Sequence, residues 1–113
     1  MKFEPTDPPR TFRVGTERQI EMSDCGQIHL EADEQVTFVT PAGRQHDFAA
    51  KSWGFYATPS VNGRLVAQGF KTALVRNSGG RWYVMVVDTD HMEDFEAYLK
   101  REGNAVEEWI DER

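Results

Sequence analysis

Positive charges and aromatic rings share one stretch of this 113-residue sequence. Residues 48–87 contain no Asp or Glu, and their five Lys and Arg residues give the stretch a charge of +5. Arg and Lys hold phosphate or carboxylate groups, while an aromatic side chain stacks on a ring or a sugar plane. The pattern predicts a binding face for a nucleotide, a sugar nucleotide or an acidic sugar. The residues expected to form it are Arg64, Lys71, Arg76 and Arg81 for charge, and Trp53, Tyr56 and Trp82 for stacking.

The same residues also have a purely structural interpretation. Aromatic side chains are usually buried, so the rings could form a core of central strands. Residues 88–113 hold ten acids and three bases, a net charge of −7, and the bases of the preceding stretch could simply offset them. A third alternative is a homo-oligomer in which the acidic C-terminal segment of one copy meets the basic sheet of another.

Residues suited to catalysis or metal binding form no convergent set. His29, His46 and His91 lie in different segments, and none has a second His two to four residues away, as metal motifs usually require. The acids around Cys25 oppose thiolate formation, which favours a small buried apolar role for this thiol. A rival hypothesis is a small enzyme of sugar metabolism in which Glu31 and His29 transfer protons, and it predicts a concave pocket there. We assign no catalytic residue, no metal ligand and no cofactor.

The composition is typical of one soluble globular domain. Apolar residues make up 39% of the chain and charged residues 28%. The longest apolar run, Trp82 to Val87, is well short of the roughly 20 residues that span a bilayer. Glu4 and Asp7 stand where a signal peptide needs an apolar segment, which predicts a cytoplasmic protein. The net charge of −6 argues against general nucleic-acid binding.

The predicted fold is mainly β (α+β). Segments rich in β-branched and aromatic residues alternate with glycine or proline turns, which is typical of consecutive antiparallel strands. Short links favour a meander of about seven to eight strands that forms a small barrel or sandwich. Residues 1–10 are expected to be an extended N-terminal lead, and residues 11–113 a single β-rich domain. The predicted strands are 11–14, 19–23, 27–31, 35–40, 45–50, 53–58, 64–70 extending toward Arg76, and 81–88.

Turn and helix signals complete this plan. Asn62-Gly63 predicts a type I′ hairpin, and residues 41–43 and 78–80 predict hairpin loops with glycine. One or two amphipathic helices are expected to close the β structure within residues 91–111. The first would begin at Asp90 as N-cap, with Glu93 completing a capping box, and end at Gly103. The second would cover residues 105–111, where Val106, Trp109 and Ile110 have helical spacing.

Three segments of the sequence, Trp53 to Leu65, Thr72 to Asn77 and Arg81 to Val86, carry a resemblance. In these segments the chain resembles small uncharacterised bacterial proteins associated with surface-glycan and sialic-acid-type sugar biosynthesis. The resemblance brings no catalytic motif and implies only an acidic-sugar context. The plan of strands closed by a C-terminal helix is also similar to a pleckstrin-homology-like domain, from which the two short helices and the acidic tail depart.

The sequence therefore favours a small cytoplasmic, non-catalytic binding or interaction module. Its expected partner is a small anionic ligand or another protein, with no membrane and no nucleic acid. The small enzyme and the homo-oligomer remain the alternatives.

Overall fold

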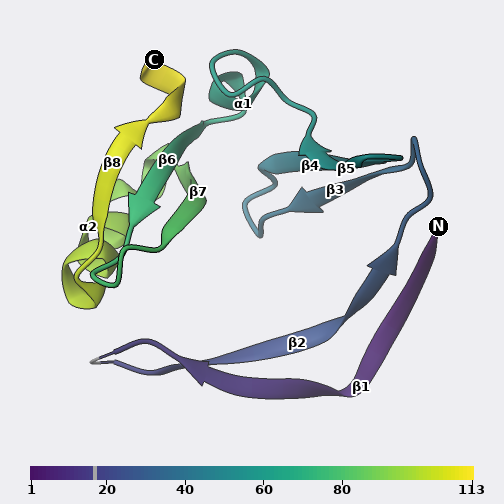
Figure 1. Cartoon of the computed structure of the whole chain (residues 1–113), viewed down its shortest axis with the longest axis horizontal. Helices are drawn as coiled ribbons and strands as arrows, with labels where there is room; N and C mark the ends of the chain where they lie inside the picture. Colours follow the sequence, from purple (N-terminus) through teal and green to yellow (C-terminus); the bar gives the residue numbers. More distant parts are fainter. Residues whose placement is uncertain (17) are drawn as a thin grey trace. The chain divides into compact units, whose positions relative to one another are not determined.

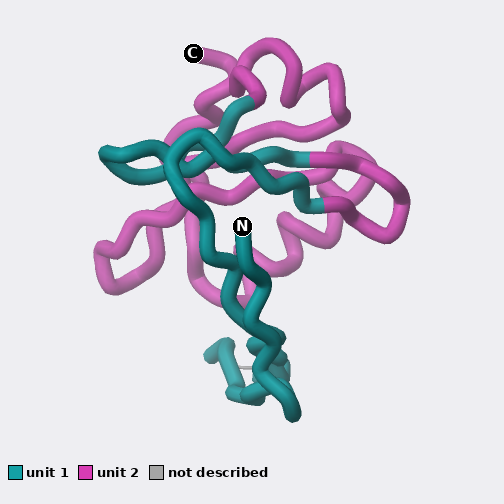
Figure 2. Tube along the Cα trace, turned by 90° about the vertical axis from the view of Figure 1, so that its right-hand side faces the viewer, with its two compact units in different colours: residues 1–38, 46–58 teal, residues 39–45, 59–113 magenta. Residues whose placement is uncertain are grey.

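The computed structural model describes residues 1–16 and 18–113 and is mainly β, with antiparallel sheets and one C-terminal α-helix. Two compact units divide these residues: 1–38 with 46–58, and 39–45 with 59–113 (Figures 1 and 2). The strands form three separate sheets, so the predicted closed barrel is wrong. Closure fails because β2 and β3, and later β5 and β6, follow one another without pairing. None of the described helices combines the length and apolar composition that crossing a membrane requires.

A two-stranded ribbon of β1 (Lys2–Val14) and β2 (Ile20–His29) begins the first unit. Residues 2–5 pair with residues 26–29, so the expected N-terminal lead is extended but belongs to a strand. The two strands predicted at 19–23 and 27–31 are one strand. The register shifts between Pro5 and Arg10, where β1 has several more residues than β2. This irregularity interrupts the alternation of side chains, so the sequence pattern does not predict that residues 2–5 pair with β2.

A three-stranded sheet follows, with β3 (Gln35–Val39), β4 (Gln45–Lys51) and β5 (Gly54–Ala57) in sequence order. These bounds confirm the predicted strands to within two residues. Residues 39–45, from the last residue of β3 to the first residue of β4, belong to the second unit. In the first unit, Ala49 and Ala50 are buried, and buried Asp47 accepts a hydrogen bond from Thr37 Oγ1 at 2.7 Å.

The sheet of the second unit has the strand order β7-β6-β8. β6 (Phe70–Arg76) lies between β7 (Trp82–Asp88) and β8 (Ala105–Trp109), and both pairings are antiparallel. The short 3₁₀ helix η1 (Thr89–His91) and α2 (Met92–Glu102) connect β7 to β8, and η2 (Ile110–Glu112) ends the chain. The rings of Phe95 on α2 and Trp109 on β8 pack edge to face, with their centroids 5.9 Å apart. α2 therefore packs on one face of this sheet.

The helix predicted over residues 105–111 is wrong, because most of these residues form the strand β8. A β-bulge in this strand gives its apolar residues the same spacing as on a helix. Val106 pairs with Val75, and Trp109 pairs with Ala73, so one extra residue of β8 is accommodated between them. Ala73 and Val75 are two residues apart and share a face of β6. The three-residue spacing of Val106 and Trp109 therefore puts both on one face of a strand.

The type I′ hairpin is also wrong, and so is the first part of the strand predicted from Arg64; its extension toward Arg76 is confirmed as β6. Residues Arg64–Ala67 form the short helix α1, and Gly63 has φ −128° instead of the positive φ that a type I′ turn needs. Ser60 supplies both acceptors at the start of this helix: its Oγ accepts the Arg64 N–H at 3.0 Å, and its carbonyl accepts the Leu65 N–H at 3.0 Å. Leu65 is 1% exposed, so burial of its side chain stabilises the turn.

Asp111 holds the C-terminal segment to β6. Its carboxylate accepts hydrogen bonds from Lys71 Nζ at 2.8 Å and from the Thr72 N–H at 2.9 Å. Burial by itself would raise the pKa of Asp111, but these hydrogen bonds outweigh it and the net pKa is lowered. The pKa of Lys71 is raised, mainly by its hydrogen bond to Asp111 and to a smaller extent by its hydrogen bond to Glu112.

We expect Asp111→Asn to reduce the free energy of unfolding at neutral pH by about 2 kcal/mol, because Lys71 loses its buried partner. The lowered pKa means that the contribution of Asp111 is complete above the ordinary pKa of about 4. It is lost as the pH falls from there through the lower folded-state value, so the variant and the wild type should converge in acid. Denaturant titrations at neutral and acidic pH measure this difference. Glu112→Gln is the control, since this exposed partner of Lys71 should change stability by less than about 0.5 kcal/mol; equal losses in both variants would contradict the assignment.

Candidate functional site

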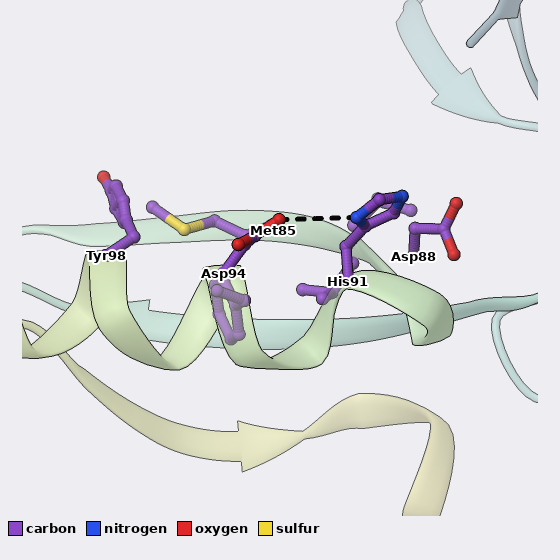
Figure 3. Close-up of a pocket in the computed structure, with 8 residues that line it drawn as sticks. Met85, Asp88, His91, Asp94 and Tyr98 are labelled. Atoms are coloured by element: carbon purple, nitrogen blue, oxygen red, sulfur yellow. Dashed lines mark hydrogen bonds and ion pairs between the residues drawn. The ribbon is translucent and has the colours of Figure 1, made fainter. Parts of the chain in front are cut away.

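A groove of about 400 Å³ lies between β7 and α2, entirely within the second unit (Figure 3). Its volume is in the range of about 300–1,000 Å³ that is usual for small-molecule sites. Its residues from η1 and α2 are spaced three or four positions apart, so they lie on one face of the helix. The residues that line it are Met85, Val86, Val87 and Asp88 on β7, His91 at the end of η1, and Asp94, Phe95 and Tyr98 on α2.

The groove has an apolar part and a polar end. In Figure 3, Tyr98 and Asp88 mark its opposite ends, and Met85, Asp94 and His91 lie between them. His91 Nδ1 lies 3.4 Å from the Asp94 carboxylate, and both side chains are largely exposed, by 62% and 86%. An apolar wall beside an exposed carboxylate suits a ligand that carries a positive charge on an apolar body.

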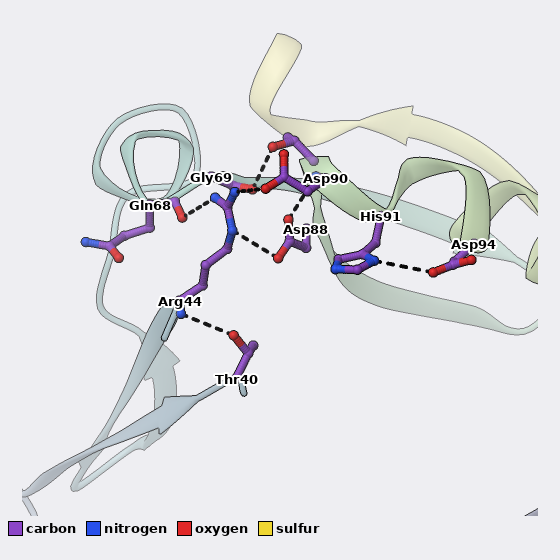
Figure 4. Close-up of polar contacts among 9 residues, drawn as sticks. Thr40, Arg44, Gln68, Gly69, Asp88, Asp90, His91 and Asp94 are labelled. Atoms are coloured by element: carbon purple, nitrogen blue, oxygen red, sulfur yellow. Dashed lines mark hydrogen bonds and ion pairs between the residues drawn. The ribbon is translucent and has the colours of Figure 1, made fainter. Parts of the chain in front are cut away.

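Arg44 anchors the polar end of the groove through Asp88 (Figure 4). Its Nε lies 3.0 Å from one Asp88 oxygen, and the other Asp88 oxygen accepts the Asp90 N–H at 2.9 Å. Arg44 Nη2 lies 2.6 Å from the Asp90 carboxylate, and Nη1 donates to the Gln68 carbonyl at 2.8 Å. The Asp88 carboxylate is thus held by Arg44 and the backbone, whereas Asp94 presents its carboxylate to solvent.

The helix cap differs from the predicted one. α2 begins one residue later than predicted, so its N-cap is His91, which makes no side-chain cap hydrogen bond, and the predicted capping box of Asp90 and Glu93 does not form. Asp88 instead caps the preceding η1, where its side chain accepts the Asp90 N–H. Asp90 contributes its side chain to Arg44 instead. The C-terminal prediction is confirmed: Gly103 ends α2 in the left-handed conformation with φ 69°.

The seven residues predicted to bind an anion are divided between the two units. In the first unit the Trp53 and Tyr56 rings stack with their centroids 6.0 Å apart and an interplanar angle of 25°. The second unit holds the other five residues: Arg64, Lys71, Arg76, Arg81 and Trp82. Arg76 and Trp82 are direct partners across β6 and β7, and Arg81 precedes Trp82, so these three residues lie at one end of the sheet.

Acids of the same chain pair with several of these cations. Lys71 Nζ binds Asp111 and, at 2.9 Å, Glu112, and it also lies 5.0 Å from the centroid of the Trp109 ring. The Arg76 guanidinium lies 3.8 Å from the Glu107 carboxylate. Arg64 on α1 also has an interaction partner. The ion pairs of Lys71 and Arg76 agree with the interpretation in which the bases offset the acidic C-terminal segment.

His29, one of the two residues of the enzyme hypothesis, ends β2 and contacts β1, whereas Glu31 lies beyond the ribbon. His29 Nε2 lies 2.9 Å from the Glu4 carboxylate, and both side chains are about half exposed. Cys25 is exposed, so the expectation that this thiol is buried is wrong. Within residues 1–16 and 18–113, no group of three or more His, Cys, Asp or Glu side chains could hold a metal ion.

The groove residues Met85, His91, Asp94 and Tyr98 were not predicted as a site. One signal was available: His91, Asp94, Phe95 and Tyr98 follow the spacing i, i+3, i+4 and i+7, which puts two polar and two aromatic residues on one helical face. Comparisons of the chain with protein-family models, with curated proteins and with solved structures find no match.

Proposed function

We propose that the protein is a non-catalytic binding module whose groove between β7 and α2 takes a positively charged group on an apolar body. The observation that carries this proposal is the exposed Asp94 carboxylate beside the wall formed by Met85, Phe95 and Tyr98. The ligand class is an ammonium or guanidinium compound. A free amine and a Lys or Arg side chain of a partner protein share this chemistry.

Charge and ring orientation both support a cationic ligand. Glu93 and Asp94 lie in the first turn of α2, and the whole segment 88–113 is strongly acidic, so the local potential attracts cations. The Phe95 and Tyr98 rings lie nearly parallel, with an interplanar angle of 9° and centroids 6.5 Å apart. The Arg101 guanidinium lies 6.0 Å from the centroid of the Tyr98 ring. The face of a tyrosine ring attracts cations, which supports a cationic ligand beside it.

Asp94→Asn is expected to weaken the binding of 2-phenylethylammonium about threefold, since an exposed carboxylate contributes up to about 1 kcal/mol to an ion pair. Isothermal titration or NMR titration at low salt measures the dissociation constant. Glu93→Gln is the matched control, because it removes the neighbouring charge from a residue that does not line the groove. The neutral analogue 2-phenylethanol should bind several-fold more weakly than the amine, and equal binding of the two would contradict the proposal.

Two further probes distinguish the sources of such a ligand. If the natural ligand is a partner protein, a blocked Leu-Arg peptide should bind more tightly than the small amine, because it adds backbone and side-chain contacts along the groove. If it is a free amine, the peptide should bind no better than the amine.

A second candidate function is supported by Arg76 and Trp82. These cross-strand partners are 53% and 54% exposed, and Arg81 is adjacent, so a cation and an aromatic face lie together as an anionic ligand with a ring requires. A nucleotide or acidic sugar bound there would perturb the Trp82 indole. A cation in the groove would perturb Met85 and Tyr98 instead.

A further inference from the structure

The β1–β2 ribbon has one face that is rich in apolar residues. In β2, Ile20, Met22 and Ile28 occupy even positions and therefore share a face. In β1, Val14, Phe12 and Phe3 lie directly opposite them, and directly opposite residues of an antiparallel pair lie on the same face. We call this set the apolar face: Phe3, Phe12, Val14, Ile20, Met22 and Ile28.

The residues between them on β2 are polar. Glu21 and Ser23 lie opposite Arg13 and Thr11, and Gln27 and His29 lie opposite Glu4 and Lys2. Alternation of apolar and polar residues with a period of two is typical of a strand that is buried on one side. The sequence of the ribbon is therefore that of a half-buried sheet.

Within the first unit, the described residues supply no such cover for the apolar face. Its six residues are between 36% and 54% exposed. The ribbon has only two strands, and no third strand from residues 1–16 or 18–113 pairs with either edge. A two-stranded hairpin is marginally stable in water and needs packing on its apolar side.

We propose that the apolar face packs against the same face of a second copy of the chain, so that two ribbons stack in a two-fold symmetric dimer. An isologous interface needs a self-complementary patch, and an apolar face meets this requirement when it carries no net charge. The charged residues on this side are Arg10 and Asp24, which face each other in the ribbon and form an ion pair at 3.3 Å. Two copies therefore meet without excess like charge, whereas a strongly charged partner would find no complement there.

The exposed area also fits a dimer. If a fully exposed side chain of this size presents about 200 Å², the exposed fractions leave about 500 Å² of the six residues uncovered in each copy. Two copies would bury about 1,000 Å² through these residues, which reaches the lower size of specific interfaces before any flanking residue is counted. Pairing of strand edges would instead leave the apolar face in water, so face-to-face stacking is the arrangement that the ribbon favours.

Two measurements on the full chain test the dimer. Sedimentation velocity over a concentration series gives the mass. NOE spectra filtered for contacts between labelled and unlabelled copies show which methyl groups meet across molecules. We expect a dimer with intermolecular NOEs among Met22, Ile20, Val14 and Ile28.

A matched pair of variants then locates the interface. Met22→Lys places a charge on the apolar face and should weaken dimerisation by at least about tenfold. Ser23→Lys places the same charge on the adjacent residue of the opposite face and should leave the dimer unchanged. A wild type that is monomeric throughout the series would overturn the proposal. So would NOEs from the apolar face only to residues of the same chain, or a dimer that Met22→Lys does not weaken.

Discussion

Gly69→Ala is expected to reduce the free energy of unfolding by about 3 kcal/mol. This loss is larger than the one expected for alanine at Gly80, a left-handed glycine with open surroundings. Gly69 has φ +91°, and a Cβ built on it would coincide with the guanidinium of Arg44. Arg44 would have to leave the Gln68 carbonyl and the Asp88 carboxylate, which is only 14% exposed and would lose its cation. The Gly69 carbonyl also accepts the Thr89 N–H at 3.0 Å, so a shift of this residue reaches the polar end of the groove.

Gly80→Ala is the matched control for that experiment. Gly80 has φ +80°, and a methyl group added to its Cα would meet no atom within 4 Å, so alanine there costs only the backbone strain of about 1 kcal/mol. The remaining difference of about 2 kcal/mol in the free energy of unfolding measures displacement of Arg44. In an Arg44→Ala background, Gly69→Ala should cost no more than Gly80→Ala. Equal costs of the two glycine variants in the wild-type background would show that Arg44 does not occupy this position.

Met85→Lys is expected to weaken the binding of 2-phenylethylammonium by at least about tenfold. The substitution puts a like charge in the wall of the groove and removes an apolar contact from the body of the ligand. Chemical-shift titration of the ligand resonances measures the dissociation constant without depending on a reporter in the groove.

Val84→Lys controls for the added charge. Val84 precedes Met85 on β7, lies on the opposite face of the sheet and is 67% exposed, so lysine there changes the net charge equally but does not enter the groove. It should leave the dissociation constant within about twofold of the wild type. If both lysine variants weaken binding equally, the effect is a general one of charge and the groove is not the site.

The sequence was informative where one local rule decides the structure. Period-two alternation located β3, β4, β5 and β7, and Gly103 located the end of α2. It failed where a local pattern has two physical interpretations. The spacing of Val106 and Trp109 fits both a helix and a bulged strand, and only the pairing with β6 decides between them.

The candidate site was less predictable than the fold. Basic residues were expected to face a ligand, but Lys71 and Arg76 lie near Asp111 and Glu107, which are more than 30 residues away in the sequence. Ion pairs of this kind depend on tertiary contacts that composition does not contain. The groove itself arises where a helical face meets the alternate residues of β7, and neither pattern alone indicates a cavity.

A two-dimensional NMR titration of the isotope-labelled chain tests the central claim most directly. The sample receives 2-phenylethylammonium and, separately, a nucleotide at low salt, while the Met85 methyl, the Asp94 and Tyr98 amides and the Trp82 indole are followed. If the groove binds cations, the amine should shift the resonances of the Met85 methyl and of the Asp94 and Tyr98 amides. The resonance of the Trp82 indole should not move. Shifts of the Trp82 indole with the nucleotide, together with a groove that does not respond to the amine, would contradict it.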